Sequence, residues 1–140
     1  MRIHKYFRLE EFVPQEIFKK YGDNSIRFIS NEVIELAVFL RERFGQIIIN
    51  NWLWEDINFN YSGFRASDCK IGAKESDHKR GVAIDIKSDR LADIKHCVTT
   101  EIFQYALLEN GCNYIENIEK TPSWIHFSCA LSNSNKIIFY

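Results

Sequence analysis

The chain predicts an α+β fold, with N-terminal helices packed on a mostly antiparallel sheet. Segments with helical periodicity come first along the sequence, and segments rich in β-branched and aromatic residues dominate its second half. The 140 residues are 46% hydrophobic and 14% aromatic, enough to build one sizeable core. We therefore expect a single domain spanning residues 1–140.

The predicted helices differ in how clearly the sequence marks their ends. Residues 9–22 are typical of a short amphipathic helix or two turns, with a proline near the start. Residues 30–45 give the clearest helix, because apolar side chains recur on one face, Ser30 or Asn31 can cap it and a glycine can end it. Residues 99–111 predict a further helix between a threonine pair and a glycine.

The strands are predicted from β-branched composition or from alternation of apolar and polar side chains. The segments with one of these patterns are residues 46–50, 57–64, 81–87, 113–118, 123–130 and 136–140. Residues 87–98 favour neither helix nor strand. The sheet is therefore expected to follow the main helix along the chain.

Charge and composition exclude several classes of protein. With 18 Lys and Arg against 19 Asp and Glu, the net charge of -1 gives no reason to expect nucleic-acid binding. No apolar run approaches the roughly 20 residues of a membrane span, so no membrane insertion is expected. The start, MRIHKYFRLEEFV, lacks the apolar core of a signal peptide, which predicts synthesis in the cytosol. The four cysteines form no close pair and favour reduced thiols over disulfides.

One stretch, SDHKRGVAIDI at residues 76–86, raises the question of a metal site. His78 and Asp85 are either two ligands of one ion, or a surface histidine followed by an ordinary buried strand. A carboxylate in the middle of an apolar strand is costly to bury unless it is paired or binds a cation. His126, in SWIHFS, has similar apolar neighbours. The His78 and Asp85 pair alone, or His126 alone, is more often structural. The hypothesis of a metal site therefore depends on finding both in one chain and in this order.

Three blocks in this order, YSGFR, SDHKRGVAIDI and SWIHFS, resemble the zinc D-Ala-D-Ala carboxypeptidase and endopeptidase family. That family has the hedgehog/DD-peptidase fold, and the likeness is greatest to its compact phage-encoded members. Its pattern runs S-G-[FY]-R, then S-x-H-x-x-G-x-A-x-D, then W-x-H-x-S. The segments HKYFRLEEFV and IINNW also look like parts of the family, so the resemblance covers nearly the whole chain.

The resemblance implies that His78, Asp85 and His126 bind one Zn²⁺. Two imidazoles and one carboxylate would leave such a site net positive and Lewis acidic. Arg65 corresponds to the family's arginine that faces the substrate or the polarised carbonyl, a role that suits a guanidinium. A surface salt bridge is the alternative role for Arg65. Gly81 would allow a tight turn beside the metal, or simply a turn before a strand.

Other residues near these blocks are expected to support the site. Ser76 and Ser128 would orient the metal ligands, and Ser76 also lies where substrate would bind. Asp77 is expected on the solvated surface. Trp52, and its neighbour Trp54, could line a substrate groove, with core packing as the alternative for at least one of them.

The general base departs from the best-known family pattern. Many relatives place a carboxylate three residues before the last histidine ligand, but this chain has Ser123 there. Compact phage-type relatives carry a glutamate at the end of the preceding strand, which matches Glu116 in NYIEN. Glu116 is therefore the expected catalytic base, with Glu119 as a weaker candidate.

The resemblance implies a zinc metallopeptidase that hydrolyses peptide bonds in peptidoglycan stem peptides or cross-bridges. Carboxypeptidase and endopeptidase activities fit these motifs equally. The implied setting is the bacterial cell wall, reached as a bacteriophage endolysin or during virion entry, with virion components as candidate partners. The alternative is a non-enzymatic, zinc-stabilised virion or cell-wall-binding module. Ser123 favours that alternative, and Glu116 favours the enzyme.

Overall fold

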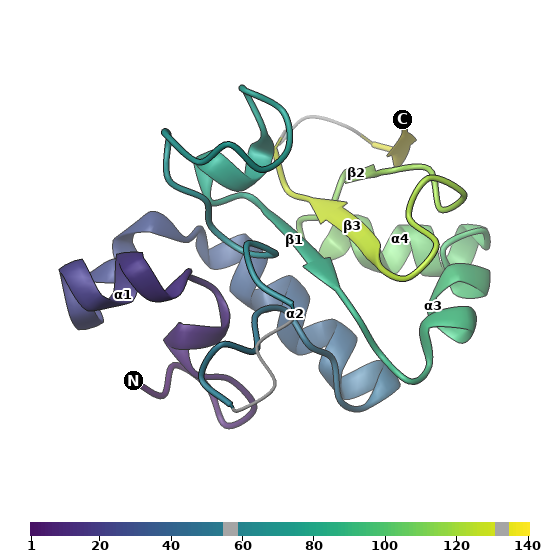
Figure 1. Cartoon of the computed structure of the whole chain (residues 1–140). Helices are drawn as coiled ribbons and strands as arrows, with labels where there is room; N and C mark the ends of the chain where they lie inside the picture. Colours follow the sequence, from purple (N-terminus) through teal and green to yellow (C-terminus); the bar gives the residue numbers. More distant parts are fainter. Residues whose placement is uncertain (55–58, 131–134) are drawn as a thin grey trace.

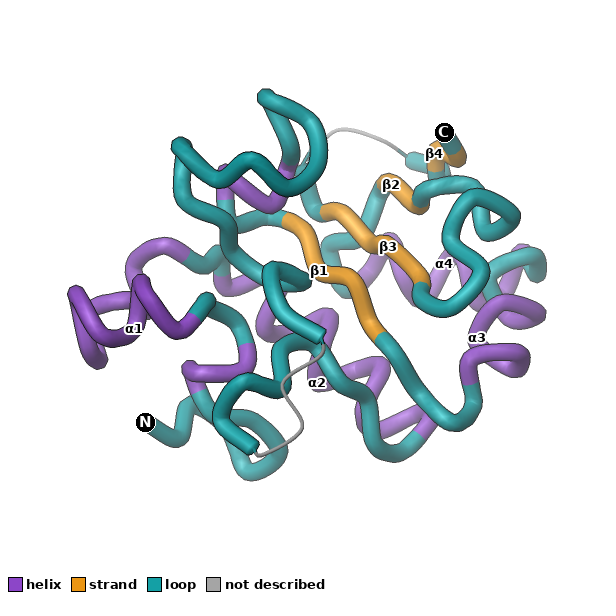
Figure 2. Tube along the Cα trace, in the orientation of Figure 1, coloured by secondary structure: helices purple, strands orange, loops and turns teal. Residues whose placement is uncertain are grey.

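The computed structural model describes residues 1–54, 59–130 and 135–140, and within them the chain is mixed α and β. These ranges contain four α-helices and one four-stranded sheet (Figures 1 and 2). The helices are α1 (Gln15–Tyr21), α2 (Asn31–Phe44), α3 (Leu91–Cys97) and α4 (Glu101–Glu109). The strands are β1 (Ala83–Ile86), β2 (Tyr114–Ile115), β3 (Ile125–Ser128) and β4 (Ile138–Phe139). The α+β prediction agrees with this arrangement.

The sheet has the strand order β1-β3-β2-β4. β3 pairs antiparallel with both β1 and β2, whereas β4 pairs parallel with β2. A mostly antiparallel sheet was expected, and four of the predicted strand segments contain the four strands. All four are shorter than the segments that predicted them.

Residues 46–50 are not a strand, although the sequence predicts one. Ile47 and Ile49 are buried as expected, but the segment pairs only through an isolated bridge between Ile48 and Lys87. Two residues further on, the N–H of Asn50 donates to the carbonyl of Glu11 instead. The apolar, β-branched composition correctly predicted burial here. The segment is not a strand because its backbone hydrogen bonds go to two different parts of the chain and not to one neighbouring strand.

Residues 59–64 of the second predicted strand are also irregular, and its residues 57 and 58 lie outside the described residues. Tyr61 has φ 59°, a left-handed conformation that interrupts any extended run. Its neighbours bond to different elements: Phe64 donates to the carbonyl of Phe12, and Ser62 accepts from Asp85. The segment is a loop packed beside β1.

The helix with the clearest predicted caps begins and ends at the expected residues. The Ser30 hydroxyl accepts a hydrogen bond from the Val33 N–H at the start of α2, and Gly45 ends the helix with φ 81°. Residues 9–22 divide into a 3₁₀ turn, Leu9–Glu11, and α1, which begins after Pro14. α3 lies in the segment that gave no clear prediction, and no side chain caps its start.

The core lies between the sheet and the helices behind it. Figures 1 and 2 show α2 and α4 on the far side of the sheet in this view. Leu36 of α2, Leu107 of α4 and Phe127 of β3 belong to one buried cluster. The opposite face of the sheet is left for polar side chains. None of the helices in the described ranges is long and apolar enough to cross a membrane, and the four cysteines are free thiols, as expected.

Candidate metal centre

His78, Asp85 and His126 come together as a buried group that could hold a metal ion. The His78 Nε2 lies 3.2 Å from the Asp85 Oδ1 and 3.2 Å from the His126 Nδ1. The His126 Nδ1 lies 2.7 Å from the same Asp85 oxygen. Zinc bonds of about 2.0–2.2 Å in a tetrahedron separate donor atoms by about 3.3–3.6 Å. The three donors need to separate only slightly to fit such an ion.

Sheet register places two of these donors side by side. Asp85 of β1 is directly opposite His126 of β3, and opposite residues of an antiparallel pair point to the same face. Ile84 and Phe127, one position away, point to the core instead. The alternation read from the sequence therefore positions the carboxylate as expected.

His78 reaches the same point from a short 3₁₀ helix, Asp77–Arg80. The Ser76 hydroxyl accepts a hydrogen bond from the His78 N–H at its start, so Ser76 supports the ligand's backbone. Gly81 ends the turn with φ 70°, and a Cβ at this position would collide with the carbonyl of Phe28. This position therefore requires glycine both for its backbone conformation and for the close approach.

A backbone carbonyl sets the orientation of the His78 ring. The His78 Nδ1 lies 2.9 Å from the carbonyl oxygen of Gly63. Because a carbonyl can only accept, Nδ1 carries a proton, which leaves Nε2 as the nitrogen that faces the centre and can bind a metal ion. A Cβ on Gly63 would collide with the Phe12 carbonyl, so the loop approaches this closely only because residue 63 is glycine.

Arg65 is the ion-pair partner of Asp85. Its Nη2 lies 3.4 Å from the Asp85 Oδ2, while Nε and Nη1 donate to the carbonyls of Tyr61 and Ile71. Only 8% of Arg65 is exposed, so it is not a surface salt bridge. Burial lowers the pKa of Arg65, and the charge of Asp85 counteracts this effect.

The carboxyl of Asp85 is held in its ionised form. Burial alone would raise its pKa, but hydrogen bonds from His126 and His78 and the positive charge these rings can carry outweigh it. The pKa of Asp85 therefore lies well below its ordinary value. An ionised carboxylate beside two imidazoles is a donor set suited to a divalent cation.

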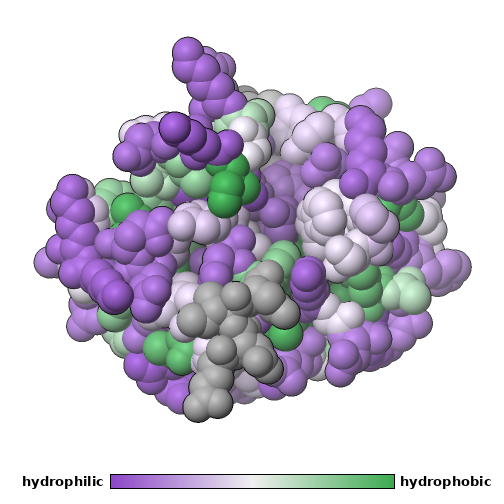
Figure 3. Space-filling view, in the orientation of Figure 1, coloured by the Kyte–Doolittle hydropathy of each residue, from purple (hydrophilic) through white to green (hydrophobic). Residues whose placement is uncertain are grey.

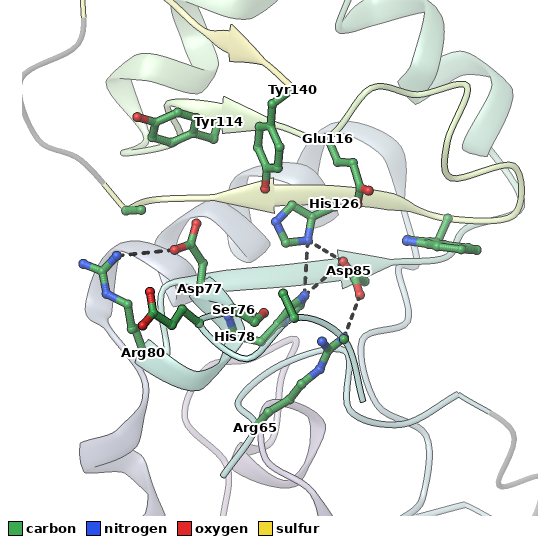
Figure 4. A pocket seen from close by; sticks show the side chains of 15 residues that line it. Arg65, Ser76, Asp77, His78, Arg80, Asp85, Tyr114, Glu116, His126 and Tyr140 are labelled. Carbon is green, nitrogen blue, oxygen red and sulfur yellow. Dashed lines mark hydrogen bonds and ion pairs between the residues drawn. The ribbon is translucent and has the colours of Figure 1, made fainter. Parts of the chain in front are cut away.

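These residues line a cavity of about 610 Å³ that also contains Glu116 and Arg65 (Figure 4). The Glu116 N–H donates to the His126 carbonyl at 3.3 Å, so Glu116 lies next to His126 across the β2–β3 pair. Figure 4 shows the Glu116 side chain on the same side of the sheet as His126. Figure 3 shows that hydrophilic side chains dominate the face of the molecule seen in Figure 1.

Several expected site residues lie elsewhere or act differently. Trp52 is not among the residues that line the cavity: its Nε1 donates to the Val13 carbonyl, and its ring packs beside Phe18. Asp77 was expected on the solvated surface, but it lines the cavity, and its carboxylate accepts a hydrogen bond from Ser128 at 2.7 Å. Ser128 thus contacts Asp77 rather than a metal ligand.

Glu119, the weaker candidate for the base, and Ser123, which occupies the family's usual base position, lie outside the cavity lining. Ser123 and Glu119 are exposed, and Glu119 is in a turn after β2. Glu116 is therefore the one of these three residues that shares the cavity with the histidines.

Sequence reasoning missed Trp124 and Tyr140, which both line the cavity. Trp124 could have been found, because it lies two residues before His126 and strand alternation sends both to one face. Tyr140 could not, because its position depends on the parallel pairing of β4 with β2.

Comparisons of the chain with models of known protein families, with curated proteins and with solved structures found no match. The geometry of the site therefore carries the functional argument. It defines a buried centre of three potential metal ligands at the base of an open cavity.

Proposed function

We propose that the protein is a zinc-dependent peptidase of the hedgehog/DD-peptidase type, acting on peptidoglycan stem peptides or cross-bridges. One observation carries this proposal: the donors of His78, Asp85 and His126 converge in a cavity that Glu116 and Arg65 also line. A purely structural metal site is usually closed by four protein ligands, whereas a catalytic one keeps a position open.

The donor set favours zinc. Two neutral imidazoles and one carboxylate are typical of catalytic zinc sites in hydrolases, and a d¹⁰ ion accepts the geometry that the protein imposes. A zinc ion held by these residues would supply a Lewis acid and bring the pKa of a coordinated water towards neutrality.

Glu116 and Arg65 are the residues that would act on the substrate. Glu116, beside His126, would accept a proton from the attacking water and return it to the leaving amine. Three of the five guanidinium N–H groups of Arg65 already hold Asp85 and two backbone carbonyls. The remaining two can face the carbonyl oxygen of the scissile bond, while the ion pair keeps Asp85 ionised.

The substrate class is proposed from the resemblance of the three motif blocks to cell-wall peptidases. The charges that line the cavity support this substrate class. They are of both signs: Arg65 and Arg80 are positive, and Asp77 and Glu116 are negative. A peptide that carries both carboxylates and amines, as stem peptides do, suits such a cavity. The proposed setting is bacteriophage lysis or virion entry.

Zinc-dependent digestion of purified peptidoglycan tests this function. The protein is stripped with a chelator, reloaded with Zn²⁺ and incubated with cell walls, and the released muropeptides are identified by mass. We expect one class of peptide bond to be cut only by the reloaded protein. The mass analysis also identifies which bond that is.

A pair of histidine variants controls the experiment. His126→Ala should lose both stoichiometric zinc and activity, whereas His96→Ala, at an exposed position on α3, should retain both. Full zinc content in His126→Ala would contradict the proposed ligand set.

Ser123 supports a second candidate, a non-enzymatic cell-wall or virion module that uses zinc for stability. This exposed serine stands where many relatives of the proposed family carry their base. Wall binding and full zinc content without any released muropeptide would favour this module over the enzyme.

A further inference from the structure

Tyr140 is brought to the candidate metal centre by the last strand. Its N–H donates to the carbonyl of Ile115, and its carbonyl accepts from the N–H of Asn117, at 3.2 and 2.7 Å. In a parallel pair this pattern places Tyr140 beside Glu116. Neighbouring positions on paired strands share a face, so the Tyr140 side chain lies on the face that carries Glu116 and His126.

The phenol of Tyr140 points into the cavity. Its ring centroid lies 6.1 Å from that of His126, nearly perpendicular to it at 85°. Figure 4 shows the hydroxyl at the end of the ring that approaches His126. Among the described residues, no group forms a hydrogen bond with this hydroxyl, and 48% of Tyr140 is exposed. The hydroxyl is therefore open to a molecule in the cavity.

Tyr140 carries its proton at neutral pH, because the ordinary pKa of a phenol is about 10. A protonated phenol is a hydrogen-bond donor as well as an acceptor. Arg65, another donor that lines the cavity, lies on the opposite side and already uses much of its guanidinium to hold Asp85 and the surrounding loop.

We propose that the Tyr140 hydroxyl is a further catalytic group, which donates a hydrogen bond to the oxygen of the peptide carbonyl under attack. This inference rests on the proposed peptidase function. When the oxygen of water adds to the carbonyl carbon, negative charge develops on the carbonyl oxygen, and the C–N bond then breaks as the amine receives a proton through Glu116. Tyr140 keeps its own proton throughout, and its hydrogen bond strengthens as the charge develops.

Tyr105 provides a control. It lies on α4 with 66% of its surface exposed, and it is not among the residues that line the cavity. Tyr140→Phe and Tyr105→Phe remove the same atom, so only the position of the lost hydroxyl differs.

The test uses both variants of the full chain, loaded with zinc. The first measurement is kcat/KM on a muropeptide cut by the wild type. The second is the Kd, by calorimetry, of a phosphinate in which the scissile amide is replaced by a tetrahedral, anionic group. For Tyr140→Phe we expect kcat/KM to fall by about 100- to 1,000-fold and the phosphinate Kd to rise by a similar factor. Zinc content and KM should not change, and Tyr105→Phe should match the wild type.

Each other outcome contradicts the inference in a recognisable way. An unchanged rate and phosphinate Kd in Tyr140→Phe would overturn the role of Tyr140 and leave the peptidase function standing. A lower rate with unchanged phosphinate affinity, or with lost zinc, would show a merely structural role. A wild type that releases no muropeptide would remove both proposals together.

Discussion

The two sides of the candidate metal centre are held in place by different kinds of hydrogen bond. On the sheet side, backbone pairing positions Asp85, His126 and Glu116, and their side chains are left for chemistry. On the loop side, residues 61–80, side chains themselves hold the backbone. Arg65 donates to two loop carbonyls, and the His78 ring contacts a third. A change at Glu116 on the sheet side should therefore alter activity alone, and a change at Arg65 on the loop side should alter activity and stability together.

The largest effect is expected on the sheet side, from Glu116→Gln. The amide keeps the size of the side chain but cannot accept the proton of the attacking water, so kcat should fall by about 10²–10⁴-fold. Zinc content and the thermal midpoint should not change, because the strand pairing does not use this side chain. Glu119→Gln, at an exposed turn position, is the control and should retain full activity. An unchanged rate in Glu116→Gln would remove the proposed base.

Arg65→Ala tests the loop side. We expect the barrier to rise by about 2.7–4 kcal/mol, the scale for losing one donor to an oxyanion. Unlike the Glu116 variant, this one should also lose stability, by about 1–3 kcal/mol, because the carbonyls of Tyr61 and Ile71 lose a buried donor. Muropeptide kinetics and urea unfolding measure the two effects.

Arg65→Lys separates charge from shape. An ammonium keeps the ion pair with Asp85 but lacks the planar fork that reaches two carbonyls at once. Arg65→Lys should therefore retain only part of the activity and only part of the stability that Arg65→Ala loses. Full recovery would show that the loop side depends on charge alone, and the contrast between the two sides would be wrong.

Gly63→Ala should have a smaller effect on the same side. The new Cβ would collide with the Phe12 carbonyl and displace the carbonyl that orients His78. Loss of such an orienting contact typically weakens metal binding by about 10- to 100-fold. Gly45→Ala is the control: it places a side chain at φ 81° with open space around it, so it should cost about 1–3 kcal/mol of stability and leave zinc affinity unchanged. Competition with a zinc chelator measures the affinities.

The smallest effect concerns thiol reactivity and leaves activity intact. Burial raises the pKa of Cys112, and burial with the charge of Glu32 raises the pKa of Cys129 to about 12. Because the thiolate is the reactive form, both cysteines flanking the sheet should resist iodoacetamide at pH 8. Cys69 and Cys97, which are both half-buried, should react first. Peptide mass analysis before and after unfolding in urea reports the order, and early labelling of Cys129 would contradict it.

The fold was predictable where a local signal and a tertiary requirement agree. The cap at Ser30 and the apolar face of the following helix were enough to locate α2. The alternation around Asp85 was enough to locate β1 and its polar face. Residues 46–50 show the limit: apolar composition predicted burial, but which backbone partners the segment finds depends on the N-terminal turn and on Lys87.

The site was predictable to the extent that it follows short sequence patterns. His78, Asp85 and His126 lie in motif blocks, and the structure brings them together. The contacts of Trp52 and Asp77 could not be predicted, because their sequence neighbours carry no information about their long-range partners, Val13 and Ser128. Tyr140 requires knowledge of a parallel strand pair formed by the last described segment.

The order of the three potential metal ligands along the chain determines when the candidate centre can form. Asp85 and His126 are 41 positions apart, and α3 and α4 lie between them. A chain synthesised only as far as α4 presents His78 and Asp85 without a third donor. Tight capture of a metal ion must therefore wait until β3 has been made and has paired with β1, since metal affinity is coupled to the folding that assembles the ligands. In a nascent chain, metal uptake would thus mark the closing of the sheet.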